Sequence, residues 1–248
     1  MIGFIIFLFG LAIGSFLNVI VYRLNIKKSF LSGRSFCPYC KKIIAWFDNI
    51  PLLSFILLAG NCRQCKKKIS WQYPLVELVT GLVFWLIYLR FGLTGQTLVY
   101  FIFCGILEVI FIYDLKYYLI LDTISLPAIL LALILNLLLG QNILNLLLGG
   151  LLGGGFFAFQ YYVSRGRWVG DGDIRLGALM GVMLGWPYLL VALLVAYVVG
   201  AIYGLVAIGL KKKAMKSEVP FGPFLTFSTL VAMLYGQLIL NWYLNLLY

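Results

Sequence analysis

Any conventional acid–base chemistry in this chain must come from its carboxylates, because the 248 residues include eight Asp and Glu but no histidine. Catalytic triads that use imidazole, zinc sites with histidine ligands and a histidine general base are therefore excluded. Four aspartates adjoin long apolar segments of the sequence: Asp114, Asp122, Asp171 and Asp173. Two aspartates at one depth that share a proton can act as general base toward water and as general acid toward a leaving amine.

We expect Asp114 and Asp173 to form such a pair. Asp173 ends a Gly-Asp-Gly-Asp run whose glycines, Gly170 and Gly172, permit a tight backbone at the start of a helix. The amide groups of a helix N-terminus favour an ionised carboxylate there. Asp114 ends a different apolar segment, so the packing of two helices can bring it to Asp173. A carboxylate at membrane depth is costly and therefore indicates a function.

The other two aspartates have simpler interpretations. Asp122 follows a turn and suits the N-cap of the next helix, so a capping role and a supporting role in the catalytic loop are equally good predictions. For Asp171 we favour a solvated loop position.

Composition places these residues in a membrane. The chain is 63% apolar and 11% charged, with a mean hydropathy of +1.04, whereas an ordinary soluble domain is about 25% charged. A soluble single-core enzyme and a disordered chain are thereby excluded. A helical span needs about 20 apolar residues. We therefore predict an all-α polytopic membrane protein with about eight transmembrane helices, at residues 2–22, 73–90, 97–113, 120–139, 142–163, 174–187, 188–210 and 223–247.

The lysines and arginines predict the orientation, because basic residues near the ends of spans stay in the cytoplasm. With the N-terminus outside, 18 of the 19 basic residues fall inside and only Arg90 falls outside. The net charge of +11 then reflects topology and contact with anionic lipid, and we expect no nucleic-acid partner. The inside set runs from Arg23 through Lys68 and adds Lys116, Arg165, Arg167, Arg175, Lys211, Lys212, Lys213 and Lys216.

The long inside loop, between the first two spans, contains two C-x2-C pairs separated by 21 residues: Cys37 with Cys40, and Cys62 with Cys65. Four thiolates at tetrahedral corners satisfy a structural Zn²⁺, and the flanking basic residues favour thiolates. Two disulfides or a redox pair are the alternative, but stable disulfides are rare on the reducing side of a membrane. We therefore predict a closed zinc site that holds the shape of the loop. The apolar block 48–54 between the pairs is expected to lie against the membrane or to enter it.

The sequence resembles the bacterial prepilin peptidases, the type 4 prepilin leader peptidase/N-methyltransferases. The resemblance covers nearly the whole chain, and its motifs follow in the family's order. Those motifs are residues 14–24, both cysteine pairs, and residues 48–54, 60–65, 69–77, 114, 121–127, 170–176 and 219–225.

The resemblance implies an intramembrane aspartic endopeptidase of the Gly-x-Gly-Asp class. Such an enzyme removes a short basic leader from prepilins and pseudopilins at the cytoplasmic membrane interface. Its catalytic pair, carried over by position, is Asp114 and Asp173, and the four cysteines are the family's metal-binding set. Residue 171 is often apolar in the family, so the charge of Asp171 is expected to raise the pKa of Asp173.

The resemblance also implies that the same protein methylates the new N-terminal residue, usually Phe, with S-adenosylmethionine as donor. The sequence has no glycine-rich nucleotide-binding fingerprint of its own. The methyltransferase candidates, by position, are Asn18, Asp48, Asn49, Gly60 and Glu77. A turn is an equally good interpretation of Gly60, and pairing with a loop Lys or Arg is an equally good one of Glu77.

These predictions divide the chain in two. Residues 1–96 form a methyltransferase-associated region with the zinc loop, and residues 97–248 form a six-helix peptidase region. We expect prepilins and membrane lipid as partners, with Asp122, Asp171 and Glu218 as candidates to contact the basic leader, and assembly into a homo-oligomer is left open. The expected location is the bacterial cytoplasmic membrane. A peptidase without methyl transfer and a small proton-coupled transporter are the alternatives.

Overall fold

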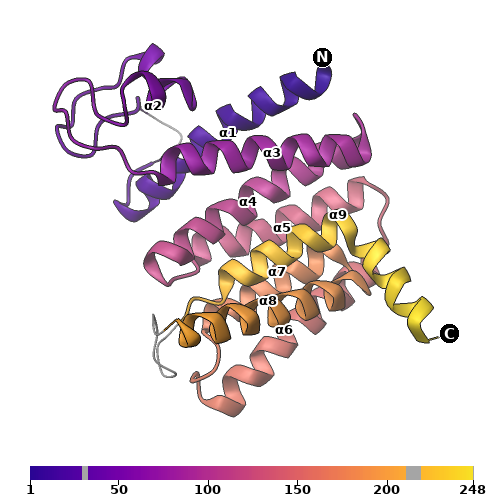
Figure 1. Ribbon diagram of the computed structural model, residues 1–248. Coiled ribbons are helices and arrows are strands. Elements are labelled where there is room, and N and C mark those ends of the chain that lie inside the picture. Colours follow the sequence, from indigo (N-terminus) through magenta and orange to yellow (C-terminus); the bar gives the residue numbers. More distant parts are fainter. Residues whose placement is uncertain (30–32, 211–218, 248) are drawn as a thin grey trace. The chain divides into compact units, whose positions relative to one another are not determined.

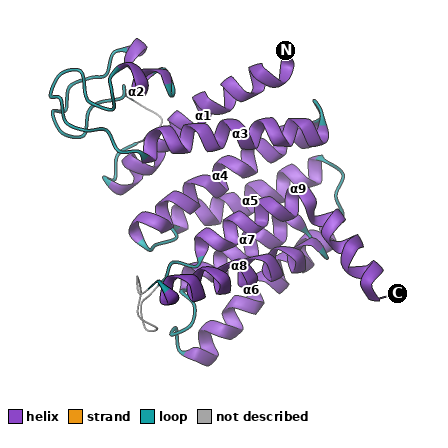
Figure 2. Cartoon of the chain, viewed as in Figure 1, coloured by secondary structure: helices purple, strands orange, loops and turns teal. Residues whose placement is uncertain are grey.

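The computed structural model describes residues 1–29, 33–210 and 219–247, and it is built from helices (Figures 1 and 2). All eight predicted segments are helical, so the predicted all-α membrane fold is confirmed. The helices are α1 (Ile2–Asn25), the 3₁₀ helix η1 (Trp46–Asn49), α2 (Leu53–Leu57), α3 (Gln72–Phe91), α4 (Gly95–Tyr117), α5 (Asp122–Leu138), α6 (Ile143–Ser164), α7 (Asp171–Leu184), α8 (Tyr188–Gly209) and α9 (Gly222–Leu247).

Six of the described helices are long and apolar enough to cross a membrane: α1, α3, α4, α6, α8 and α9. The prediction of eight spans is therefore higher than length and composition support. Helix α5 is apolar but has 17 residues, and α7 has 14. At 1.5 Å per residue, α7 is about 21 Å long, short of a hydrocarbon core about 30 Å thick. The predicted segment 174–187 also ran on into the turn that ends α7.

The chain forms two compact units, an N-terminal unit (Met1–Val109) and a C-terminal unit (Ile110–Tyr248), and α4 begins in the first and ends in the second. The division at residue 96 that assigned a function to each part stays a prediction.

In the N-terminal unit, α1 and α3 pack as antiparallel neighbours through small residues. A Cβ on Gly10 would lie 2.8 Å from the Cα of Gly81, and a Cβ on Gly14 would lie 2.8 Å from the Cα of Glu77. Close backbone approach of this kind is a usual basis for helix association in lipid. The packing brings the end of α1 and the start of α3 together, so the cysteine-containing loop leaves and returns at one end of the helix pair.

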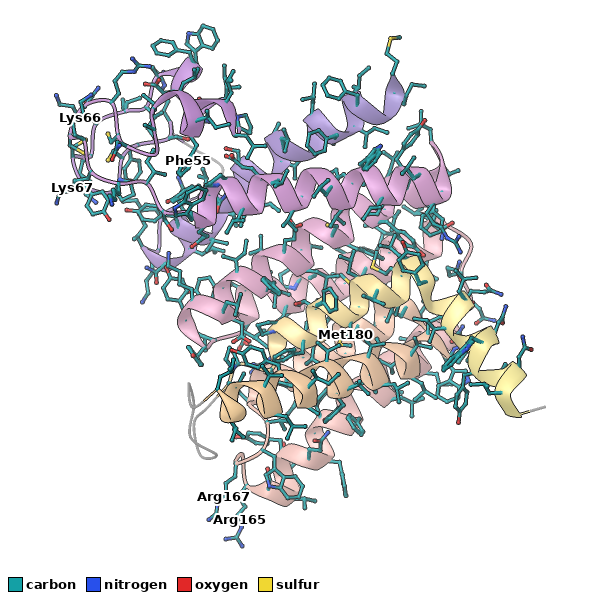
Figure 3. All side chains as sticks on the ribbon, in the orientation of Figure 1. Phe55, Lys66, Lys67, Arg165, Arg167 and Met180 are labelled. Atoms are coloured by element: carbon teal, nitrogen blue, oxygen red, sulfur yellow. The ribbon has the colours of Figure 1, made fainter. Side chains whose placement is uncertain are left out.

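In the C-terminal unit, α7 is the central helix and packs against α5, α6, α8 and α9. Nine of its fourteen residues are buried, and Leu176, Leu179 and Met180 are fully enclosed. Figure 3 labels Met180 among the packed side chains of these helices. A short helix that carries an aspartate near its start is thus held in place by its neighbours on several sides.

Glycines bring α6 and α7 into backbone contact. A Cβ on Gly177 would lie 2.6 Å from the carbonyl oxygen of Gly153, and a Cβ on Gly181 would overlap the carbonyl oxygen of Gly149. Each helix therefore carries a Gly-x-x-x-Gly pair on the shared face. This seam fixes the position of α7 along α6 and hence the position of the first turn of α7.

A turn at Gly185-Trp186-Pro187 joins α7 to α8. Gly185 has a φ of +67°, which favours glycine. The side chain of Asn145 holds the turn, because its Oδ1 accepts from the Trp186 N–H at 2.7 Å and its Nδ2 donates to the Trp186 carbonyl at 3.0 Å.

Gly181→Ala should destabilise the protein by about 1–3 kcal/mol, because the new methyl group overlaps the backbone of α6. Gly155→Ala is the matched control, since its added Cβ meets nothing within 4 Å and gains helix propensity. Thermal unfolding in detergent micelles measures both variants. Equal melting temperatures for the two would contradict the proposed role of the α6–α7 seam.

Candidate functional site

Asp114 lies in the last turn of α4, within the C-terminal unit, and is 5% exposed. The backbone N–H of Gly222, the first residue of α9, donates a hydrogen bond to its carboxylate. A Cβ at Gly222 would lie 2.5 Å from the Asp114 Oδ2, so any side chain there collides with the carboxylate. The Pro-Phe-Gly-Pro run that contains Gly222 therefore forms one wall around Asp114.

Asp173 is the third residue of α7 and is 6% exposed. Its Oδ2 accepts from the N–H of Gly170 at 2.9 Å, and its own N–H donates to the Gly170 carbonyl at 3.2 Å. These two bonds cap the start of α7 and fix the carboxylate against the preceding backbone. The predicted placement of Asp173 on a tight backbone at the mouth of a helix agrees with this geometry.

Asp173 lies outside the six long apolar helices, and burial raises its pKa to about 6. The Gly170 N–H acts in the opposite direction, while the charges of Asp114 and Asp171 raise the pKa further. The predicted effect of Asp171, a rise in the pKa of Asp173, thus agrees in direction. Because the charge of Asp114 acts on Asp173, the two buried carboxylates form one electrostatically coupled site.

Ile120 is a member of this site that sequence reasoning missed. It is 8% exposed, between α4 and α5, and a Cβ on Gly172 would lie 2.8 Å from its own Cβ. Its Cδ1 would lie 3.4 Å from a Cβ on Gly222. Ile120 therefore packs against the glycine beside each aspartate, which explains why residue 172 must be small. The available signal was the glycine beside Asp173, Gly172, which indicates a close neighbour.

Arg175 joins the two remaining aspartates of this region. Its Nη1 lies 2.7 Å from the Asp122 Oδ1, and its Nη2 lies 3.3 Å from the Asp171 Oδ2. The side chains of Asp122 and Asp171 are 53% and 66% exposed, so these ion pairs contribute little to stability. Both carboxylates already have a cationic partner.

The predicted positions of these two aspartates need correction. Asp122 is the first residue of α5, and Leu121 occupies the N-cap position without a side-chain cap. Asp171 is the first residue of α7 and not a loop residue. Each carboxylate is thus in a first turn, where the helix dipole favours negative charge. Glu218 and the lysines at 211, 212, 213 and 216 lie outside the described residues.

The four cysteines of the long loop form a compact sulfur cluster in the N-terminal unit. Their Sγ atoms all lie within 4.8 Å of one another, and those of Cys37 and Cys65 are 3.9 Å apart. A tetrahedral zinc with four Zn–S bonds of about 2.3 Å separates its sulfurs by about 3.8 Å. The donor set therefore fits zinc, and the described cysteines are free thiols with no disulfide.

The two cysteine pairs have the same local structure. In each hairpin the first cysteine carbonyl accepts from the residue four positions on: Lys41 to Cys37 at 2.9 Å and Lys66 to Cys62 at 3.0 Å. Lys41 and Lys66 both have a φ of +58°. Figure 3 shows Lys66 on the outer edge of the loop. Two matching hairpins thus present two sulfurs each to one point, as the spacing predicted.

Backbone amides prepare this cluster for a metal. The N–H groups of Cys65 and Gln64 lower the pKa of the Cys62 thiol to about 7. The pKa of Cys65 is raised to about 11 despite the Lys67 N–H, because desolvation and the neighbouring sulfurs disfavour a second thiolate. A cation that binds four sulfurs removes this repulsion and displaces the protons.

Two of the methyltransferase candidates, Asn18 and Gly60, have structural roles in the N-terminal unit. Asn18 is 1% exposed and donates to the carbonyl of Tyr73 at 3.2 Å, so it ties α1 to the start of α3. Gly60 has a φ of +68°, and a Cβ there would lie 3.2 Å from the Phe55 ring. The alternative interpretation of Gly60 as a turn glycine explains this geometry. A part of either residue in methyl transfer stays a prediction.

Glu77 and Asp48 fix the apolar block between the cysteine pairs. The Oε2 of Glu77 accepts from the Leu52 N–H at 2.9 Å, and the Ser15 hydroxyl also donates to this carboxylate. The alternative expectation of a loop Lys or Arg as its partner is not what the described residues show. Asp48 makes a forked pair with Arg63 at 2.7–3.1 Å, which lowers the pKa of Asp48.

Comparison with known sequences decides the family. The sequence model of the Bacterial Peptidase A24 N-terminal domain matches residues 8–91, and that of the Type IV leader peptidase family matches residues 101–205. The chain belongs to the type IV leader peptidase family. The first match contains the cysteine loop, and the second contains both Asp114 and Asp173.

Full-length relatives agree with this membership. The chain is 35% identical to a prepilin leader peptidase/N-methyltransferase of Legionella pneumophila, over 96% of this chain and 93% of the relative. It is 34% identical to the protein of that name in Aeromonas hydrophila (97% and 93% covered) and 32% identical to that in Bacillus subtilis (98% and 98%). No solved structure matches the chain. Family and apolar helices together make it a multi-pass inner membrane protein.

The purified protein should contain about one zinc ion per chain. Cys62→Ser should lose most of it, because three sulfurs and a hydroxyl replace a closed four-sulfur site. Cys104→Ser is the control, since Cys104 is buried in α4 away from the cluster. Elemental analysis by mass spectrometry measures the ratio of zinc to protein chains in each sample. Equal zinc in wild type and Cys62→Ser would refute the assignment.

Asp173→Asn should stabilise the fold at pH 8 and leave it unchanged near pH 3. Folding raises the pKa of Asp173 from 3.8 to about 6, so ionisation of this carboxyl lowers the free energy of unfolding. This loss grows as the pH rises from 3.8 to about 6. It is absent at low pH, where the carboxyl is protonated in both the folded and the unfolded state. The gain is at most about 3 kcal/mol. Asp171→Asn, in an exposed position, removes only the smallest contribution to the raised pKa of Asp173 and should gain much less. Thermal melts at both pH values test this, and a gain that is independent of pH would count against it.

Proposed function

We propose that this chain removes the basic leader from type IV prepilins with Asp114 and Asp173 and then methylates the new N-terminus. The observation that carries the peptidase assignment is the coupled site itself: two buried carboxylates on different helices, each held by the N–H of a glycine. Membership of a leader peptidase family supplies the reaction class. The transporter interpretation is dropped, because it explains neither the glycine-bound pair nor the family.

Cleavage needs one ionised and one protonated carboxyl group. The pKa of Asp173 near 6 brings its proton exchange close to neutral pH, and the charge of Asp114 contributes to that shift. The ionised member takes a proton from water, and the water oxygen attacks the peptide carbonyl carbon. The protonated member donates to the carbonyl oxygen. The C–N bond then breaks, and the amine leaves with a proton.

The charges around the pair support a cytoplasmic position for it. Asp114 is followed by Lys116 at the end of α4, and Asp173 is followed by Arg175 in the first turns of α7. Basic residues at the ends of spans stay inside. In this orientation the N-terminus is outside and the cysteine loop inside. A prepilin whose apolar helix lies in the bilayer then presents its leader junction at the depth of the pair.

The exposed oxygens of Asp122 and Asp171 support a role in holding the leader. Each has one oxygen paired with Arg175 and more than half of its side chain open to solvent. A Lys or Arg of the leader can bind beside Arg175 or replace it. The three groups then form an exchangeable charge cluster next to the coupled aspartates.

The methyltransferase half of the proposal concerns the N-terminal unit. S-adenosylmethionine supplies an electrophilic methyl group, and the named relatives include N-methyltransferase in their names. The sulfur cluster and the bonds of Asp48 and Glu77 hold the loop on α1 and α3. The zinc has a structural role in this proposal, because four sulfurs leave no open position.

Asp114→Asn and Asp173→Asn should each lower leader cleavage at least a thousandfold, because an amide can neither accept nor donate the catalytic proton. Asp48→Asn makes the same chemical change in the cysteine-containing loop of the N-terminal unit, which takes no part in the proposed cleavage, and should stay within about threefold of wild type. A prepilin embedded in detergent micelles is the substrate, and mass spectrometry detects the released leader. Normal cleavage by either buried-site variant would remove the assignment.

The same samples separate the two activities. A pre-cleaved pilin given S-adenosylmethionine should be methylated by Asp114→Asn at close to the wild-type rate. Wild-type protein that cleaves but transfers no methyl group would show a peptidase alone.

A further inference from the structure

A cavity of about 230 Å³ lies between α1 and the cysteine-containing loop, within the N-terminal unit. One wall is a single face of α1, and the other is made by the loop, including Ser35, Asn49 and Pro51. The residues on the α1 wall are Ala12, Ser15, Phe16, Val19 and Arg23, spaced as on one side of a helix. The peptidase chemistry of the C-terminal unit uses none of these residues.

The cavity changes character along its length. Its α1 wall is apolar at Ala12, Phe16 and Val19 and ends at Arg23, which lies about 16 Å from Ala12 along the helix axis. Helix α1 is one of the six spans, so the apolar part lies at bilayer depth and the Arg23 end faces the loop. The site therefore suits a molecule with an apolar part in the membrane and a polar group at its surface.

Backbone bonds hold the polar end of the cavity in place. Arg23 is 5% exposed and donates to the carbonyls of Ser29, Gly33 and Arg34 at 2.9–3.0 Å. On the same α1 wall, the Ser15 hydroxyl donates to the carboxylate of Glu77, and this carboxylate also accepts from the N–H of Leu52, the loop residue after Pro51. Both walls are thus fixed by buried polar groups.

We propose that this cavity is the methyl-acceptor site, which holds the N-terminal residue of the processed prepilin. The inference rests on the proposed methyltransferase function. The terminal side chain lies against Phe16 and Val19, and the α-amine lies toward Ser35 and Asn49. In the reaction the lone pair of the neutral amine forms the new N–C bond, the C–S bond of the donor breaks, and the sulfur keeps its electrons as a thioether. The amine proton passes to water at the polar end.

Size and access favour the acceptor over the donor as the occupant. Pockets for drug-sized ligands are about 300–1,000 Å³, and S-adenosylmethionine is of that size, whereas this cavity is smaller and suits one amino-acid residue. The donor is water-soluble and gains nothing from a wall at bilayer depth. The acceptor is attached to an apolar helix and arrives from the membrane side.

Photo-crosslinking tests the site directly in the full-length protein in lipid nanodiscs. A benzophenone amino acid is placed at Val19, which lines the cavity, or at Ile20, which is similarly half-buried but does not. With pre-cleaved, unmethylated pilin, position 19 should give at least fivefold more adduct than position 20, mapped by mass spectrometry to the first residues of the pilin. Equal adducts, or adducts at position 19 with labelled S-adenosylmethionine in place of pilin, would overturn the assignment.

Cavity-filling variants give an independent measure. Val19→Trp should lower methylation of pre-cleaved pilin at least tenfold and leave leader cleavage within twofold, while Ile20→Trp should leave both unchanged. Methylation by Val19→Trp at the wild-type rate would overturn the acceptor site while the methyltransferase function stood. Wild-type protein that cleaves but never methylates would instead remove that function, and the acceptor site with it.

Discussion

The fold keeps two carboxylates, those of Asp114 and Asp173, buried at helix ends. Burial alone would leave each of them protonated or would drive it to the surface. Here each carboxylate receives one hydrogen bond from a glycine N–H, from Gly222 to Asp114 and from Gly170 to Asp173. One bond offsets part of the desolvation cost without fixing the ionised form. Ile120 packs against Gly172 and comes close to Gly222, so the backbone around both acids is set by contact and not by further charge.

Glycine performs a second task away from the acids. Apolar side chains gain little by leaving lipid for another helix, so association in a membrane depends on close packing and on backbone approach. The seams between α1 and α3 and between α6 and α7 both rely on facing glycines whose replacement would put a Cβ into the neighbouring backbone. The first seam sets the two ends of the cysteine loop side by side. The second seam fixes the short helix α7, and with it the position of Asp173 along α6.

The parts of this structure that depend on local pattern could be predicted from the sequence. Apolar segments predicted the helices, and the spacing of Cys37, Cys40, Cys62 and Cys65 predicted the cluster, because two short hairpins are enough to turn the sulfurs inward. The parts that depend on partners from other helices could not be predicted. Two examples are the ion pairs of Arg175 with Asp122 and Asp171, and the hydrogen bond from the Leu52 N–H to Glu77. To predict them, one must know which elements lie side by side. The predicted eight spans exceed the six described helices that are long and apolar enough to cross a membrane, because hydropathy does not reveal that α7 is short and enclosed by other helices.

The metal cluster and the cavity are linked by an unbroken series of contacts in the N-terminal unit. Arg63 lies within the second cysteine pair and makes a forked ion pair with Asp48. Asn49, which follows Asp48 in the chain, lines the cavity. Pro51 lines it as well, and its neighbour Leu52 is held by Glu77. A zinc ion held by the four sulfurs would therefore also set one wall of the cavity, because it would fix the hairpin that carries Arg63. Within the C-terminal unit, Asp114 and Asp173 are held instead by the N–H groups of Gly222 and Gly170. In the proposed function, methyl transfer would thus use a wall set by the sulfur cluster, and leader cleavage would use an acid pair set by two glycine N–H groups.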